Sequence, residues 1–335
     1  MSIVMTGGGT GGHLAIIKAV KEHLGDEELI YIGSTKGQDK QWFEHDDDFS
    51  HTYFFETRGV VNQGALGKIK SLLMMAKATM KAMKLLRKHQ AKVVFSVGGF
   101  SAAATAFAAK ILRVPLVIHE QNAALGSLNK LLKPYATEFI SSYLEESPIK
   151  AYPIKQIFFD NAHVRQKVEN IIFLGGSQGA KAINTLALQI APVLKERGIK
   201  IIHQAGQKNI DEVQQAYDEL GIEAEVFGFT DKLADYMNEA DLAIARAGAS
   251  TLWELSATAL PTLYIPYPYA ASDHQYHNAQ FLVEKDLAWI MRENEIDTQK
   301  VLSLLDENLA DKSKGLMQIV EKNGSEKIAD VLTQM

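Results

Sequence analysis

Two glycine-rich stretches have the residue types that bind a phosphate group or a developing oxyanion. Gly7–His13 follows the apolar run Ile3–Thr6, and Gly175–Ala180 follows the run Ile171–Leu174. Glycine lets the backbone approach a ligand closely. The helix predicted after each stretch supplies N–H groups and the positive end of a dipole. The sequence therefore predicts two ligand-binding loops, each at the end of a strand.

The first stretch does not fit the two commonest phosphate-binding motifs well. It is not a Walker A loop, because His13 and Leu14 stand where that motif has Lys and Ser or Thr. Its glycines fit G-x-G-x-x-G, but the next apolar run, Leu29–Ile32, ends without the acidic residue that holds a ribose. A tight turn without a ligand is the remaining alternative, and five glycines in six residues are costly in chain entropy for that purpose. His13, at the predicted helix start, is the candidate general base, with a structural histidine as the alternative.

Polar residues that could hold a nucleotide follow the apolar run Leu242–Ala245. Ser250 and Thr251 are good helix-start residues whose N–H groups can bind phosphate. Glu254, one turn further on, could accept hydrogen bonds from a ribose diol, or could simply cap the helix.

A metal site is disfavoured. Asp273, His274 and His277 have a suggestive spacing, but nothing nearby supplies further ligands. Gln275 and Asn278 are instead predicted to point into a sugar site.

Composition excludes several classes of protein. The chain has 335 residues, of which 47% are hydrophobic and 22% charged, a composition typical of a soluble globular protein of about two domains. The net charge of −5 argues against a large basic surface for nucleic acid. With no cysteine there is no disulfide, thiolate nucleophile or iron–sulfur cluster. The N-terminus does not read as a signal peptide, and no run of about 18 apolar residues predicts a membrane span.

Short apolar runs alternate with helical stretches and predict βαβ units with parallel sheets. Further strands are expected at Leu29–Ile32, Val93–Val97, Leu116–His119, Ile199–His203, Ala224–Val226, Leu242–Ala245 and Leu263–Ile265, with helices at Ala180–Glu196 and Ser325–Met335. The strand–glycine–helix pattern restarts at Ile171, which predicts two similar α/β domains with a linker near Pro148–Asp160. Parallel sheets bind ligands at the carboxyl ends of their strands, so two such domains would form a cleft.

Taken together, the motifs resemble the MurG family of glycosyltransferases. The resemblance rests on Gly8–His13, His119–Asn122 with Gly126 and Asn129, Gly175–Ala180, Arg246–Ala249 with Glu254, and His274–Ala279. It implies a GT-B fold of two Rossmann-like domains facing across a cleft. Residues 1–155 would be the acceptor and membrane-facing domain and 156–324 the UDP-GlcNAc-binding domain, with a helix at about 325–335 packing back on the first.

The resemblance also implies roles for matching residues. On the donor side these are Thr10, Gly11, Gly12, Asn122, Lys155, Ser177, Gln178, Gly179, Thr230, Arg246, Ala249, Ser250, Thr251, Leu252, Trp253, Glu254, Gln275 and Asn278. On the acceptor side they are Gly98, Gly99, Phe100 and Glu120. The chain departs from the family pattern at Ile16, at Phe100 and in Ala151–Lys155, where Lys155 keeps a positive charge but lacks the bidentate fork of arginine.

The implied reaction is inverting transfer of GlcNAc from UDP-GlcNAc to the C4 hydroxyl of MurNAc in lipid I, which gives lipid II for peptidoglycan. His13 would be the base, and helix N-termini would stabilise the leaving diphosphate without a metal or cofactor. A UDP-GlcNAc 2-epimerase, a glycolipid glycosyltransferase of the same fold and a non-catalytic nucleotide-sugar-binding subunit are the alternatives.

Residues 68–88 are basic and apolar, with no acidic residue. The segment is either an ordinary helix with a solvated face or a helix that rests on an anionic membrane surface. The membrane-contacting residues would be Leu72, Leu73, Met75, Lys77, Met80, Lys81 and Lys84. Because the acceptor's polyprenyl tail stays in the bilayer, we expect peripheral attachment to the cytoplasmic face of the cell membrane.

Overall fold

The computed structural model describes residues 1–57, 65–176 and 178–335, with the side chains of 65–70 left aside. It consists of two compact units. Unit 1 comprises Met1–Ile154 and Asn323–Met335, and unit 2 comprises Lys155–Lys322. Each unit has its own parallel sheet and its own hydrophobic core.

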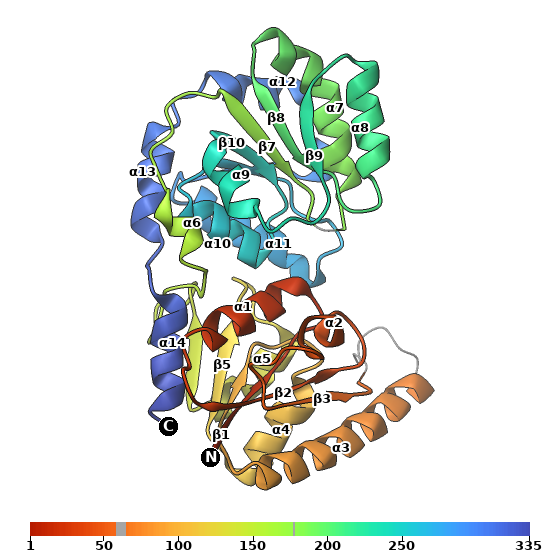
Figure 1. Ribbon diagram of the computed structural model, residues 1–335, viewed down its shortest axis with the longest axis vertical. Helices are drawn as coiled ribbons and strands as arrows, with labels where there is room; N and C mark the ends of the chain where they lie inside the picture. Colours follow the sequence, from red (N-terminus) through yellow and green to blue (C-terminus); the bar gives the residue numbers. More distant parts are fainter. Residues whose placement is uncertain (58–64, 177) are drawn as a thin grey trace. The chain divides into compact units, whose positions relative to one another are not determined.

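Unit 1 contains a six-stranded parallel sheet in the order β3-β2-β1-β4-β5-β6. In Figure 1, α3 and α4 lie along one side of this sheet and α1 along the other. The strands are β1 Ser2–Thr6, β2 Glu28–Ser34, β3 His51–Phe55, β4 Ala91–Ser96, β5 Leu116–Glu120 and β6 Glu138–Ser141. The helices are α1 Gly11–Lys21, α2 Asp39–Phe43, α3 Ala65–Lys88, α4 Ala103–Leu112, α5 Ser127–Leu132 and α14 Gly324–Thr333.

Unit 2 repeats this strand order, with a six-stranded parallel sheet in the order β12-β11-β10-β7-β8-β9. The strands are β7 Asn170–Leu174, β8 Lys200–Gln204, β9 Ala224–Phe227, β10 Leu242–Ala245, β11 Thr262–Tyr264 and β12 Trp289–Ile290. The helices are α6 Ile157–Asp160, α7 Lys181–Glu196, α8 Ile210–Glu219, α9 Leu233–Glu239, α10 Ala249–Ala257, α11 His274–Val283, α12 Thr298–Ser303 and α13 Ala310–Ile319.

The central strands form because they are apolar throughout. Residues Ile3, Val4 and Met5 of β1 are at most 1% exposed, which is the pattern of a strand covered by helices on both faces. The same holds for Ile171–Leu174 of β7. The predicted α/β class, with two domains of parallel strands, is confirmed.

This strand order fixes where a ligand can bind. In both sheets the order reverses between the first and fourth strands of the unit, β1 and β4 in unit 1 and β7 and β10 in unit 2. In open α/β sheets the crevice for a ligand lies outside the carboxyl ends of the strands at such a point. The loops after these four strands are the glycine-rich stretches and the residues after Ala245.

The C-terminal helix α14 belongs to unit 1 and packs against α1. Gly324 begins it in close contact with the backbone, because a Cβ there would lie 2.5 Å from the Tyr152 carbonyl oxygen. At its other end, the Lys92 ammonium donates to the Thr333 carbonyl oxygen at 3.1 Å and to Glu27 at 2.8 Å. None of the helices in the described ranges is both long and apolar enough to cross a membrane.

Candidate functional site

Two glycine turns, Gly7–Gly9 after β1 and Gly98–Gly99 after β4, pack against each other at the carboxyl ends of these strands. The Gly8 N–H donates to the Gly98 carbonyl oxygen at 3.3 Å. A Cβ on Gly7 would lie 2.6 Å from the Val97 side chain, and one on Gly9 would lie 2.7 Å from the Phe100 ring. Protein atoms therefore occupy the Cβ positions of Gly7 and Gly9, and ligand binding by this stretch stays a prediction.

His13 stands at the start of α1, where side chains from two loops meet. Its Nδ1 lies 3.0 Å from the Thr10 hydroxyl oxygen, and the Gln121 amide nitrogen lies 3.0 Å from its Nε2. The His13 side chain is half-buried, whereas Thr10 is exposed. Gln121 belongs to the polar run His119–Asn122 that the sequence marks as a site segment, but the sequence indicates no specific role for it. The structure thus joins the base candidate to two polar groups that orient its ring.

Glu120 lies beneath the loop that follows β5. It is 2% exposed, and its carboxylate accepts hydrogen bonds from the N–H groups of Asn122 at 3.0 Å and Gly126 at 2.8 Å. It also accepts one from the Asn129 amide at 3.0 Å. Glu120 therefore shapes the loop that presents Asn122 and the start of α5.

Gly98 and Gly99 serve packing in the same way as Gly7–Gly9. Their φ values are +84° and +78°, and a Cβ would lie 2.9 Å from the Asn129 amide or 2.5 Å from the Gly8 carbonyl oxygen.

His119 of β5 is fully buried, and burial together with His13 lowers its pKa to about 3. His119 is therefore neutral at physiological pH.

Two glycines that follow central strands of the unit 2 sheet border open space, unlike Gly7–Gly9 after β1 in unit 1. Apart from the adjoining residues of the chain, no atom of the described residues lies within 4 Å of the position that a Cβ would occupy on Gly176 or on Gly248. Gly176 follows β7 and has a φ of +78°, and Gly248 follows the neighbouring strand β10. The two glycines thus flank the point where the strand order reverses, and a ligand can approach the backbone there. Gly179, in contrast, packs against the Ala205 carbonyl oxygen.

The helix after Gly248 points its N-terminus to the same edge of the sheet. α10 begins at Ala249, one residue earlier than the expected start, with Gly248 as its N-cap. Ser250 and Thr251 therefore lie within the first turn, where backbone N–H groups are oriented toward an anion. The next two residues, Leu252 and Trp253, are at most 2% exposed and anchor the helix in the core.

Glu254 is the candidate ribose-binding carboxyl. It retains intermediate exposure, but the protein atoms around its carboxyl are dense enough that desolvation raises its pKa to about 7. Within the described part of the chain, no hydrogen bond or ion pair reaches this carboxyl. A partly accessible carboxyl without a protein partner is suited to accept hydrogen bonds from a ligand.

Three other predicted donor residues hold loops in place. Arg246 donates to the Ile265 carbonyl oxygen at 2.9 Å and forms an ion pair with Glu293. Asn278 is fully buried, and its amide donates to the Ala247 carbonyl oxygen at 3.2 Å. The Gln275 side-chain oxygen accepts the Tyr267 N–H at 2.9 Å. The structure therefore places Asn278 beneath the loop and not on its ligand-facing side.

The remaining predicted donor residues are more scattered. Thr230 follows the edge strand β9, and its hydroxyl accepts the Lys232 N–H at 3.1 Å. Gln178 is exposed, Lys155 is half-buried at the start of unit 2, and Ser177 lies outside the described residues. Gly11 and Gly12 are the first residues of α1.

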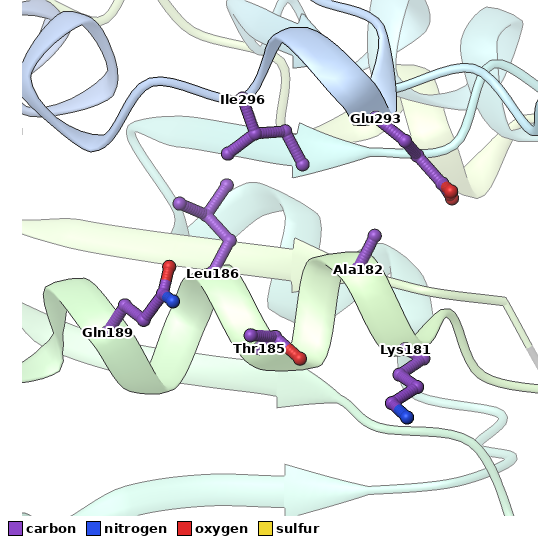
Figure 2. Close-up of a pocket in the computed structure, with 7 residues that line it drawn as sticks. All are labelled: Lys181, Ala182, Thr185, Leu186, Gln189, Glu293 and Ile296. Carbon is purple, nitrogen blue, oxygen red and sulfur yellow. The ribbon is translucent and has the colours of Figure 1, made fainter.

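Two cavities in unit 2 lie next to this region, and neither is lined by the predicted donor residues. One of about 540 Å³ is bordered by Pro266, Pro268, Tyr269, Arg292, Glu293 and Asn294. The other, of about 480 Å³, lies between α7 and the segment that contains Glu293. In Figure 2, Leu186 of α7 points toward Ile296 across it. Glu293 borders both cavities and forms the ion pair with Arg246.

On α3, apolar and basic side chains are exposed together. Leu72, Leu73 and Met80 are 58%, 61% and 56% exposed. Lys77, Lys81 and Lys84 are exposed on the same helix, and Met75 is half-buried.

Among the described residues, no group of three or more His, Asp or Glu side chains could hold a metal ion.

Comparisons with known proteins cover both units. Residues 3–141 match the glycosyltransferase family 28 N-terminal domain, and residues 170–335 match the family 28 C-terminal domain. A UDP-N-acetylglucosamine--N-acetylmuramyl-(pentapeptide) pyrophosphoryl-undecaprenol N-acetylglucosamine transferase of Sulfurovum sp. is 80% identical over 99% of this chain and 98% of its own. The protein of the same name from Sulfurimonas denitrificans is 54% identical over 100% and 99%. The crystal structure of Acinetobacter baumannii MurG has a TM-score of 0.83 and 26% identity, with 100% of this chain and 99% of that chain covered.

Proposed function

The chain belongs to glycosyltransferase family 28, and we propose that it transfers GlcNAc from UDP-GlcNAc to the C4 hydroxyl of MurNAc in lipid I, which forms lipid II. The observation that carries this proposal is 80% identity over 99% of the chain to a relative named for that reaction. The presence of both family domains supports it, because donor and acceptor each need a binding surface.

The donor is bound at the carboxyl edge of the unit 2 sheet. The diphosphate lies against the backbone at Gly176 and Gly248, where a Cβ would meet no protein atom. The first turn of α10, with Ser250 and Thr251, directs N–H groups and its positive dipole end at the leaving diphosphate. The Glu254 carboxyl accepts hydrogen bonds from the ribose hydroxyls. Helix N-termini thus supply the stabilisation, and the reaction needs no bound metal or cofactor.

His13 is the general base of the transfer. The C4 oxygen of MurNAc forms the new bond to the anomeric carbon of GlcNAc, and the bond from that carbon to the phosphate oxygen breaks. The C4 hydroxyl proton passes to the His13 ring, and UDP carries away the electron pair of the broken bond. Thr10 orients the imidazole, since its hydroxyl lies 3.0 Å from Nδ1. The Gln121 amide lies 3.0 Å from Nε2, and the acceptor hydroxyl takes its place there when Nε2 accepts the proton. A positioned base of this kind contributes roughly 10²–10⁴-fold to the rate.

The enzyme works on the cytoplasmic face of the cell membrane as a peripheral protein. Leu72, Leu73 and Met80 of α3 are exposed beside the lysines of the same helix. Apolar side chains that enter the headgroup region and lysines that contact anionic lipid would bring the protein to its polyprenyl-linked acceptor.

UDP release from UDP-GlcNAc tests the reaction. The assay contains a chelator and is run with and without a lipid I analogue. We expect release only with the analogue, and a fall of about 10²–10⁴-fold in kcat for His13→Ala. Conversion of the donor without the analogue would instead indicate an epimerase. If His13→Ala kept nearly full turnover, His13 would not be the base.

A further inference from the structure

A buried carboxylate lies directly beneath the glycine loop of unit 1. Asp39, the first residue of α2, is 0% exposed. Its Oδ1 accepts the Gly9 N–H at 2.6 Å, and its Oδ2 accepts the Ser34 N–H at 2.9 Å. Burial of a carboxylate costs free energy unless hydrogen bonds replace water, and here one oxygen is bonded to the glycine loop and the other to the end of β2.

Tyr31 of β2 completes this arrangement. Its hydroxyl donates to the Gly7 carbonyl oxygen at 2.9 Å, and the side chain is fully buried. Burial, with Asp39 adding to it, raises the pKa of Tyr31 far above its usual range, so the hydroxyl stays protonated as a donor. A Cβ on Gly33 would lie 2.6 Å from the Tyr31 hydroxyl and 2.8 Å from Asp39 Oδ2, so both groups fill the space above that glycine.

The loop that these two side chains hold leads directly to the base. Gly9 precedes Thr10, whose hydroxyl lies 3.0 Å from His13 Nδ1. The Asp39 carboxylate, 2.6 Å from the Gly9 nitrogen, therefore holds the backbone at Gly9. The next residue is Thr10, which orients the imidazole. Loss of that hydrogen bond would let Thr10 and the first turn of α1 shift together.

We propose that Asp39 and Tyr31 are positioning residues for the transfer reaction, which hold the Gly7–Gly9 backbone and thereby place Thr10 and His13. This inference rests on the proposed function. Neither side chain touches the substrates, because both are buried beneath the loop. A displacement of about 1 Å at a reacting group can cost on the order of 10²-fold in rate, so the expected effect is on kcat.

Asp39→Asn tests the proposal, because it keeps the shape of the side chain but replaces one acceptor oxygen with an NH₂ group. We expect kcat to fall by about 10- to 100-fold. We expect the KM for UDP-GlcNAc to change less than kcat, because the groups proposed to hold the nucleotide, Gly176, Gly248 and the start of α10, lie in unit 2. We also expect the Gly9 amide proton, which faces a carboxylate in the wild type, to move upfield in a nitrogen–proton correlation spectrum.

Asp46→Asn is the matched control. Asp46 pairs with Lys21 at 2.6 Å at the other end of α1, so its loss destabilises the same helix without reaching the loop. We expect a lower melting temperature with full kcat. Loss of kcat in Asp46→Asn equal to that in Asp39→Asn, or wild-type kcat in a folded Asp39→Asn, would overturn the proposal.

Tyr31→Phe keeps the test decisive if Asp39→Asn does not fold. It removes one oxygen atom and leaves the Gly7 carbonyl without that donor. We expect kcat to fall by several-fold, with a smaller change in the KM for UDP-GlcNAc, and wild-type kcat would refute the positioning role. Failure of the proposed function is recognised separately, because the wild-type protein would then release no UDP with the lipid I analogue. The Gly9 amide shift tests the loop contact in either case.

Discussion

At the scale of single residues, the groups that we propose to contact a ligand are easier to find in the sequence than the groups that hold them in place. His13 and Glu254 stand beside glycine loops in the sequence, and the structure places both at carboxyl edges of their sheets. Asp39 gave no comparable signal, because its partner Gly9 lies 30 residues away. Asn278 has the residue type of a sugar ligand, yet it is fully buried beneath the loop. Such roles depend on tertiary contacts that spacing along the chain does not encode.

Arg165 illustrates the same limit. It is 1% exposed, and its guanidinium donates to the carbonyl oxygens of Ala240 at 3.2 Å and Met237 at 3.1 Å, and also to that of Thr258. These carbonyls lie at the ends of α9 and α10, where a positive charge meets the negative end of the helix dipole. No local pattern marks this arginine, since its helix-end partners are 72 to 93 residues distant.

The pKa of Glu254 leads to a prediction for Glu254→Gln. Desolvation raises that pKa from 4.5 to about 7 in the folded protein. The raised pKa favours the folded state while the carboxyl is protonated, and this contribution to stability is complete below about pH 4.5. The contribution is lost as pH rises through about 7, because the folded protein then holds a desolvated carboxylate. The wild type should therefore lose about 1–3 kcal/mol of unfolding free energy through this group between pH 5 and pH 8. Glu254→Gln, whose side chain does not ionise, should not show this loss. Urea unfolding without ligand at the two pH values measures it.

Glu284→Gln is the control for this measurement, because it removes an exposed carboxyl at the end of α11. We expect its unfolding free energy to follow the wild type at both pH values. Parallel pH dependences for Glu254→Gln and the wild type would show that the Glu254 carboxyl is not desolvated in solution.

At the scale of elements, the sequence predicted central strands well and edge strands poorly. The predicted runs at Ile3–Thr6, Leu116–His119 and Leu242–Ala245 match β1, β5 and β10 within one residue at each end. Of the four edge strands, β3, β6 and β12 were missed, and β9 was predicted at Ala224–Val226. An edge strand pairs on one side and is partly exposed, as the half-buried residues of β3 show. Its apolar run is therefore shorter and its pattern weaker.

The exposed face of α3 leads to a prediction about membrane binding. We expect the wild type to sediment with vesicles that contain anionic lipid, and less so as salt increases. Lys77→Glu with Lys81→Glu should weaken binding by at least about 25-fold, from roughly 1 kcal/mol for each lysine near the surface. Lys200→Glu, an exposed lysine of unit 2, serves as the control and should bind as the wild type does. Equal sedimentation with neutral and anionic vesicles would count against an electrostatic attachment.

At the scale of the whole molecule, the two units are built on one plan. Their sheets have the same strand order, and the glycine loops follow the equivalent strands β1 and β7. The sequence revealed this repeat through the strand–glycine–helix pattern. It did not reveal that the loops differ in packing. In unit 1 protein atoms fill the space beside Gly7–Gly9, whereas Gly176 and Gly248 in unit 2 face open space. The difference depends on neighbouring loops, such as the one with Phe100, and not on the glycines themselves.

Separate cores imply that a donor ligand should stabilise one unit more than the other. Lys155–Lys322 forms its own compact unit with its own core, and the chain enters and leaves it at two points. If UDP binds at the carboxyl edge of the unit 2 sheet, a concentration of 100 times its Kd adds about 2.7 kcal/mol to the stability of that unit. Amide hydrogen exchange in β7 and β10 should then slow by up to about 100-fold, while exchange in β1 and β4 changes little. Mass spectrometry of peptides from these strands, with and without UDP, measures both. Equal slowing in β1 and β4 would mean that the units open as one, and slowing confined to β1 and β4 would place the nucleotide in unit 1.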